Sequence, residues 1–220
     1  VREGGVYRDV AVCPDSNLER WKLSDGSVWQ GDVCIFAGGP WLGSLFPELL
    51  GELIRPTRQE VFYFGPPAAD PRFLEAQMPC WLCFGKGTFY GIPGNLHRGF
   101  KVADDTRGEP IDPSTAERTV TPEQLAAARR FLAERFPALA GAPLLGAEVC
   151  QYENSSNGDF LIDRHPKHSN VWLVGGGSGH GFKHSAALGE ALAQTLSAGR
   201  SDIDLSPFSL ASLMARRIGG

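Results

Sequence analysis

The sequence has no long apolar run and no excess of positive charge. A membrane-spanning helix needs about 20 consecutive apolar residues, and no run in this 220-residue chain approaches that length. The net charge is -4, which argues against nucleic acid as a partner, because phosphate binding needs a basic face. With 42% hydrophobic residues, the chain is expected to form one large or two small globular domains, without a membrane or nucleic-acid partner.

Cysteines are few and irregularly spaced, and their number is odd, which makes a disulfide framework a poor explanation. They are Cys13, Cys34, Cys80, Cys83 and Cys150. This usage predicts a reducing compartment, the cytoplasm. Cys80 and Cys83 form a C-x-x-C pair, but the sequence has no second pair to complete a zinc site. A packing role is therefore expected for this pair.

The first part of the chain has the order strand, turn, helix. Asp25-Gly26 lies between two short alternating runs, 21–24 and 27–30, which predicts a hairpin. Residues 33–37 are continuously apolar, as in a strand of a parallel sheet that is buried on both faces. A Gly-rich turn and a short helix ending near Leu50 follow, as in a doubly wound domain.

The rest of the chain alternates strands with two helices. The helix near 122–136 has Thr121 as its cap, Pro122 at its first position and Gln124 to complete a capping box. A second helix is expected over 182–198. The expected strands are 55–64, 80–84, 88–92, 99–103, 144–152, 160–162 and 171–174.

Five glycines occur within the seven residues 175–181, between a predicted strand and a predicted helix. Such a loop lets backbone N–H groups approach a ligand, and the helix N-terminus favours negative charge. The alternative is a tight turn that needs positive φ. The glycine spacing differs from the dinucleotide-binding fingerprint.

Four segments, in order along the chain, carry a family resemblance. They are Tyr90-Gly91-Ile92-Pro93 with Lys101 after it, Val149-Cys150-Gln151-Tyr152, Asp163-Arg164-His165-Pro166, and Ser178-Gly179-His180-Gly181-Phe182-Lys183. They resemble segments of the monomeric sarcosine oxidase and N-methyltryptophan oxidase family of FAD-dependent enzymes. The resemblance extends over about residues 33 to 208.

The resemblance implies an α+β fold with α/β character at both ends. Residues 1–52 and 151–220 would belong to an FAD-binding domain, and residues 53–150 to a substrate domain with a mixed, largely antiparallel sheet. The family opens with a G-x-G-x-x-G turn that holds the ADP half of FAD, and this sequence has no such motif and no starting Met. The chain is therefore expected to be a C-terminal fragment of a longer parent, without FAD and inactive alone.

The same resemblance implies roles for two residues near the flavin ring. Cys150 matches the position that forms a thioether to the flavin, which requires a thiol able to ionise; from the residues alone it is a buried strand thiol. Lys101 matches a lysine near flavin N5 that promotes reaction with oxygen by fixed positive charge. Its alternative is a solvated strand lysine.

Three further residues match the substrate pocket, and one departs from the pattern. Lys183 matches a lysine that contacts a substrate carboxylate, although it could be a surface lysine. Tyr90 and Tyr152 match tyrosines of the pocket wall, although either could belong to a core. Asp105 stands where the family often has His, and an acid there would attract a more cationic amine.

The cofactor is expected to lie against the glycine loop, and no metal site is expected. His180 and His184 have helical spacing but lack a carboxylate partner. The expected cofactor contacts, besides Cys150, are Gly176, Gly177, Ser178, Gly179, His180, Gly181, Phe182 and Lys183.

These matches predict that the parent oxidises a secondary or N-methyl amino acid to an imine, with oxygen as acceptor and hydrogen peroxide as product. The partners would be a small amine and oxygen, and the cofactor would carry the redox chemistry. Two alternatives stay open. One is a flavin dehydrogenase of the same superfamily with another electron acceptor, and the other is a binding domain without flavin.

Overall fold

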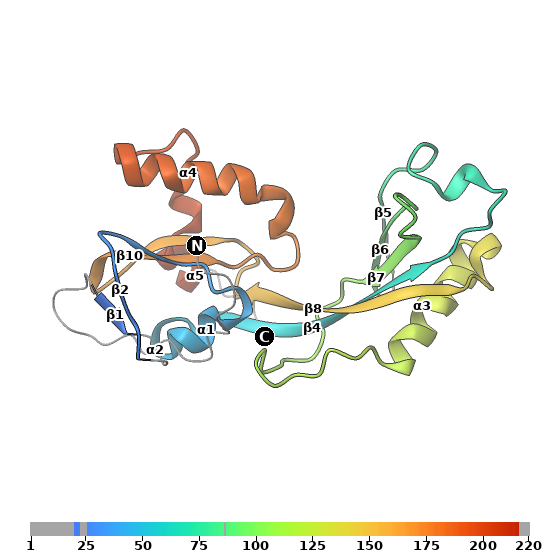
Figure 1. Ribbon diagram of the computed structural model, residues 1–220, viewed down its shortest axis with the longest axis horizontal. Coiled ribbons are helices and arrows are strands. Elements are labelled where there is room, and N and C mark those ends of the chain that lie inside the picture. The colour runs from blue at the N-terminus through green and yellow to red at the C-terminus, as the bar shows by residue number, and fades with distance from the viewer. Residues whose placement is uncertain (1–19, 23–25, 86, 216–220) are drawn as a thin grey trace. The chain divides into compact units, whose positions relative to one another are not determined.

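The computed structural model describes residues 20–22, 26–85 and 87–215. The chain divides into two compact units. Unit 1 comprises residues 1–56, 112–114 and 152–220, and unit 2 comprises residues 57–111 and 115–151. Two long strands, β4 (Ile54–Phe64) and β8 (Leu144–Ser155), each include residues of both units (Figure 1).

Unit 1 contains a three-stranded sheet with the order β3-β10-β9. Its strands are β3 (Cys34–Phe36), β9 (Leu161–His165) and β10 (His168–Gly175). Strand β10 runs parallel to β3 and antiparallel to β9. The parallel pairing expected for residues 33–37 is confirmed.

Both faces of β10 are covered, because its side chains alternate between two clusters. Trp172 packs with Leu192 of helix α4 (Ser185–Ala198), which lies along this sheet in Figure 1. Val171 and Leu173 pack in the other direction. The helices that contribute to that second cluster are α1 (Leu42–Leu45), α2 (Pro47–Leu50) and α5 (Leu210–Ala215).

The expectation that residues 33–37 are buried on both faces is wrong. Val33 is 44% exposed and Ile35 is 45% exposed. Strand β3 is an edge strand of its sheet in the described chain. Of residues 33–37, Cys34 and Phe36 pack against the core. A continuous apolar run therefore identified the strand but overstated its burial.

A separate antiparallel pair joins β1 (Arg20–Lys22) and β2 (Val28–Gln30), with Trp21 opposite Trp29. The pairing confirms the hairpin expected around Asp25-Gly26. Asp25 itself, like Cys13, lies outside the described residues.

Unit 2 contains most of a five-stranded sheet with the order β5-β6-β7-β4-β8. The additional strands are β5 (Trp81–Phe84), β6 (Thr88–Ile92) and β7 (Phe100–Asp104). The pairs β5–β6, β6–β7 and β7–β4 are antiparallel. The expected strands of this region, and the largely antiparallel sheet, are confirmed.

Helix α3 (Pro122–Arg135) begins as predicted at Thr121, whose Oγ1 accepts the N–H of Gln124 at 3.3 Å. The predicted capping box is wrong in its second half. The N–H of Thr121 donates to Glu60 Oε2 at 2.8 Å, because this buried carboxylate of β4 reaches the cap from another element. Gln124 is thereby left free of that role.

The last long helix starts later than the sequence suggests. A 3-10 segment at Gly181–His184 precedes α4, and the residue that caps the C-terminus of α4, Gly199, has a φ of 74°. Further 3-10 segments are Gly39–Trp41, Pro71–Phe73, Pro137–Leu139 and Ser206–Phe208. Across the described residues, no helix combines the length and apolarity that a bilayer crossing requires.

Candidate functional site

The five-stranded sheet separates its side chains onto two faces. We call the side that packs on α3 the closed face; it includes Phe62, Phe64, Phe100 and Val102. Residues of the opposite parity form what we call the lysine face, which includes Tyr63, Tyr90 and Lys101. Lys101 lies directly opposite Tyr63 on β4 and Ile92 on β6, and residues opposite one another across a pair share a face.

Lys101 and Tyr90 are brought together on the lysine face. The ammonium nitrogen of Lys101 lies 4.9 Å from the centre of the Tyr90 ring, within the range of a cation–π interaction. Both side chains are half-buried. The sequence placed these two residues in one motif, and the strand register gives them a common face.

Cys150 lies on β8 and is half-buried. Burial is the largest influence on its thiol and raises the pKa above 9.0, while the charges of Lys101 and Arg118 lower that pKa and the charge of Glu148 raises it. The thiol therefore lies within electrostatic reach of Lys101. A neighbouring cation favours the thiolate, which is the reactive form.

Asp105 lies one residue beyond the end of β7 and is exposed. Its N–H donates to the carbonyl of Thr88 at 2.7 Å. The neighbouring Asp104 turns its carboxylate to the backbone, where Oδ1 accepts from Thr106 N at 2.9 Å. The two acids therefore differ in role, since Asp104 holds a turn while Asp105 lies at the surface.

In unit 1, the inner half of the glycine turn, which we define as Gly175–Ser178, is held by β8. The N–H of Gly177 faces Glu153 Oε2 at 3.5 Å, and the N–H of Ser178 donates to the Glu153 carbonyl at 3.0 Å. The Ser178 hydroxyl accepts from Ser155 N at 3.1 Å. These donors of Gly177 and Ser178 therefore have partners within the protein.

The outer half of the turn, which we define as Gly179–Lys183, presents its residues outward. Phe182 is 94% exposed, and His180 and Lys183 are also exposed. Tyr152 packs beneath Gly179 so closely that a Cβ at position 179 would lie 2.1 Å from its ring. Glycine is therefore required there by space as well as by its φ of 82°.

Lys183 does not occupy the first turn of an α-helix, because α4 starts at Ser185. Its ammonium nitrogen donates to the carbonyl of His180 at 3.2 Å. The rings of His180 and His184 lie 5.4 Å and 5.6 Å from the ring of Phe160. Within the described residues, no three His, Cys, Asp or Glu side chains gather as a metal site would need.

The predicted residues thus fall into two groups. Lys101, Tyr90, Asp105 and Cys150 belong to unit 2, and Tyr152 and the glycine turn belong to unit 1. Two residues that the sequence did not single out join them. Tyr63 could have been found from its strand register opposite Lys101, whereas nothing in the sequence pattern indicated Glu153.

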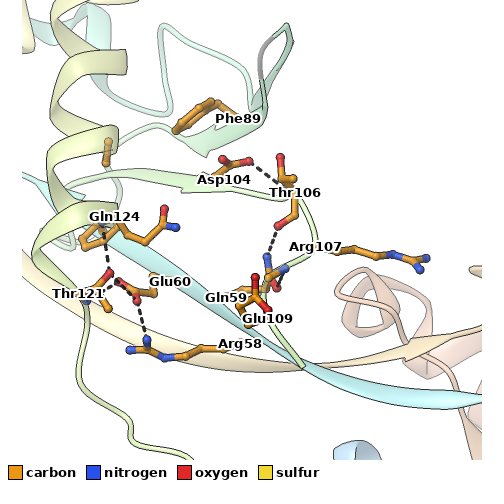
Figure 2. A pocket seen from close by; sticks show the side chains of 13 residues that line it. Arg58, Gln59, Glu60, Phe89, Asp104, Thr106, Arg107, Glu109, Thr121 and Gln124 are labelled. Carbon is orange, nitrogen blue, oxygen red and sulfur yellow. Dashed lines mark hydrogen bonds and ion pairs between the residues drawn. The ribbon is translucent and has the colours of Figure 1, made fainter. Parts of the chain in front are cut away.

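Unit 2 also has a pocket of about 370 Å³ on the α3 side of the sheet (Figure 2). Figure 2 shows Glu60 between Arg58 and Thr121. Arg58 is paired with Glu60 at 3.0 Å, and Glu60 also accepts from the Thr121 backbone and hydroxyl. Glu60 thus supports the start of α3, although Arg58 Nε is buried without a hydrogen-bond partner among the described residues. None of the predicted site residues lines this pocket.

A comparison with protein families matches residues 7–195 to the DAO family, described as FAD dependent oxidoreductase. Monomeric sarcosine oxidase of Bacillus sp. (strain NS-129) is 36% identical over 194 residues, which are 86% of this chain and 49% of the relative. N-methyl-L-tryptophan oxidase of Escherichia coli is 34% identical over 206 residues, 91% of this chain and 52% of the relative. The chain spans about half the length of these curated relatives.

Solved structures share the fold. L-proline dehydrogenase from P. horikoshii aligns with a TM-score of 0.76 at 19% identity, over 96% of this chain and 55% of that one. Amadoriase I from Aspergillus fumigatus aligns with a TM-score of 0.75 at 23% identity, over 95% and 51%. At these identities the likeness concerns the fold alone.

Proposed function

We propose, since the chain belongs to the FAD dependent oxidoreductase family, that the whole protein oxidises a secondary or N-methyl amino acid to an imine. Oxygen is the proposed acceptor and hydrogen peroxide the product. The observation that carries this proposal is the lysine face of unit 2, where Lys101 lies over the Tyr90 ring and its charge reaches the Cys150 thiol. The relatives named as oxidases of sarcosine and N-methyl-L-tryptophan support the substrate class.

The residues present fit a flavin. Gly179 lies directly over the Tyr152 ring, and the segment that follows Gly179 is exposed, including Phe182. The outer half of the turn is proposed to contact the cofactor, and Cys150 is proposed to attach it covalently. When bound, FAD supplies the two-electron redox chemistry, and the protein supplies orientation and charge.

Lys101 and Lys183 are proposed to act at different stages. Lys101 supplies a fixed positive charge in a half-buried position, which stabilises negative charge as it develops on oxygen. Lys183 supplies a second cation on the outer half of the turn and binds the substrate carboxylate through a charge-assisted hydrogen bond. Separate cations allow binding and reoxidation to be altered independently.

The remaining side chains define the amine that is accepted. Tyr90 and Tyr152 supply aromatic walls that exclude water and still offer a hydroxyl. Asp105, exposed at the end of β7, places an acid near the lysine-bearing strand and favours a cationic amine over a second carboxylate. Replacing Asp105 with His is therefore expected to shift the preference among amines.

The proposal is tested by the attachment of the flavin. In the flavin-loaded protein, acid denaturation should leave the flavin on the polypeptide in wild type and release it in Cys150→Ser. Cys83→Ser, a half-buried thiol of the same unit, is the matched control and should retain the flavin. Complete release from denatured wild type would refute covalent attachment, and wild-type protein that takes up no flavin would refute the proposed function itself.

A further inference from the structure

Glu153 is half-buried beneath the inner half of the glycine turn, and its Oε1 is buried. Its Oε2 lies 3.5 Å from the N–H of Gly177, and its own carbonyl accepts the N–H of Ser178 at 3.0 Å. The N–H of Gly176 also acts on the carboxylate. Side chain and backbone of this one residue thus face three successive N–H groups of the turn.

The Glu153 carboxylate also occupies the space that a side chain at position 175 would need. A Cβ at position 175 would lie 2.2 Å from Glu153 Oε1 and 2.6 Å from Leu42 Cδ2. Gly175 is therefore needed for the space that Glu153 fills rather than for a positive φ. Among the described residues, no group donates a hydrogen bond to Oε1.

The carboxyl group of Glu153 is expected to destabilise the folded state. Burial raises the pKa of Glu153 to about 7, although the N–H groups of Gly176 and Gly177 lower it. An uncompensated buried carboxyl group destabilises a protein relative to an apolar residue of similar size. Stability alone therefore does not explain a glutamate at this position.

The conformation of the turn supplies a reason. Gly176, Ser178 and Gly179 have φ values of 75°, 45° and 82°, and a positive φ in a non-glycine residue such as Ser178 is costly unless the surroundings impose it. Of these surroundings, Glu153 contributes two of the contacts that set the backbone between Gly175 and Ser178. The outer half, Gly179–Lys183, starts where those contacts end.

We propose that Glu153 is a positioning residue: its carboxylate fixes Gly175–Ser178 and thereby sets the conformation in which Gly179–Lys183 is presented to the flavin. This inference rests on the proposed function for the identity of the ligand. It assigns to Glu153 an effect through the turn and not a contact with cofactor or substrate. An acceptor of the same shape without charge should therefore serve almost as well.

The first measurement is hydrogen exchange of the backbone amides, made without cofactor. Glu153→Leu removes the acceptor, Glu153→Gln keeps one, and Glu190→Gln on the exposed surface of α4 is the control. We expect exchange of the Gly177 and Ser178 amides to become at least about tenfold faster in Glu153→Leu only, a factor that corresponds to about 1.4 kcal/mol. Amides of β10 should remain protected in every folded variant.

The second measurement is FAD affinity in a Cys150→Ser background, where the cofactor is exchangeable. Glu153→Leu should raise the Kd for FAD by roughly tenfold, and Glu153→Gln should restore an affinity close to that of Cys150→Ser alone. If Glu153→Leu does not fold, Glu153→Ala removes the same acceptor with less steric demand and takes its place.

The outcomes separate this inference from the proposed function. Unchanged exchange of the turn in Glu153→Leu and Glu153→Ala overturns the positioning role, whether or not FAD binds. Faster exchange with unchanged FAD affinity also overturns it, because the turn then moves without consequence for the cofactor. If Cys150→Ser takes up no FAD while the exchange result holds, the proposed function fails and the link from Glu153 to the flavin fails with it.

Discussion

The sheet of unit 2 and the glycine turn of unit 1 position their chemical groups by different means. In the sheet, strand alternation places Lys101 and Tyr90 on one face and Phe100 and Val102 on the other. In the turn, alternation plays no part, and the division between an inner and an outer half depends on contacts to Glu153. The sheet should tolerate the loss of any one polar side chain, whereas the turn should respond strongly to the loss of Glu153.

Because of this difference, we expect that in the sheet of unit 2 the residues that stabilise the fold are not those that affect the reaction. Closed-face substitutions should unfold unit 2 without any specific effect on the reaction. Lysine-face substitutions should alter a reaction step and leave the stability nearly unchanged. The glycine turn should not show this separation, because Glu153 takes part in both.

The largest effect is expected on the closed face. Phe100 is fully buried and contacts Trp81, Phe73 and Phe136, so Phe100→Ala should lower the free energy of unfolding by about 3–5 kcal/mol. Phe84→Ala, on β5 and 73% exposed, is the control and should cost less than about 0.5 kcal/mol. Equal losses in urea unfolding would show that the closed face is not the core of unit 2.

On the lysine face, Lys101→Met should slow reoxidation of the reduced flavin by oxygen by about 10²–10³-fold, because a fixed charge is lost. Stopped-flow mixing of reduced protein with oxygen measures this step, and anaerobic mixing with amine measures reduction. Lys167→Met, at the exposed turn between β9 and β10, should change neither. Impaired reduction with a normal oxygen step would favour a dehydrogenase over an oxidase.

At Glu153, stability and chemistry are not separate, and the pH dependence of unfolding should show this. Its folded pKa, about 7, is raised above the ordinary value of 4.5, so its contribution favours folding below pH 4.5 and is lost as the pH rises through 7. Glu153→Gln should therefore become more stable than wild type between pH 5 and 8, by at most about 3 kcal/mol. A difference in unfolding free energy that stays constant over this range would place the carboxyl group in solvent.

The smallest effect is expected on the outer half of the turn. Lys183→Ala should weaken binding of carboxylate-bearing amines by about 1.5–3 kcal/mol, with little change in unfolding free energy because the side chain is exposed. Amines without a carboxylate should bind as they do to wild type, and Lys167→Ala is the control. A uniform loss for both kinds of amine would assign Lys183 to the cofactor or to the fold instead.

Features that depend on neighbouring residues could be predicted from the chain alone. Turn residues rich in Pro, Gly and Asp delimited 88–92 and 99–103 as the strands that carry Tyr90 and Lys101. Thr121 with Pro122 indicated the start of α3. The ordered family segments gave the family, FAD dependent oxidoreductase. Each is encoded within a few residues or in a motif, so no knowledge of distant contacts was needed.

Contacts between distant segments could not be predicted in this way and became visible in the fold. Glu60 takes the cap of α3 from 61 residues away, and Glu153 faces the turn from 24 residues away. The exposure of Ile35 follows from the place of β3 at a sheet edge. The burial of a residue and its hydrogen-bond partners depend on which elements pack together. The hydrophobic pattern within a single segment does not specify those partners.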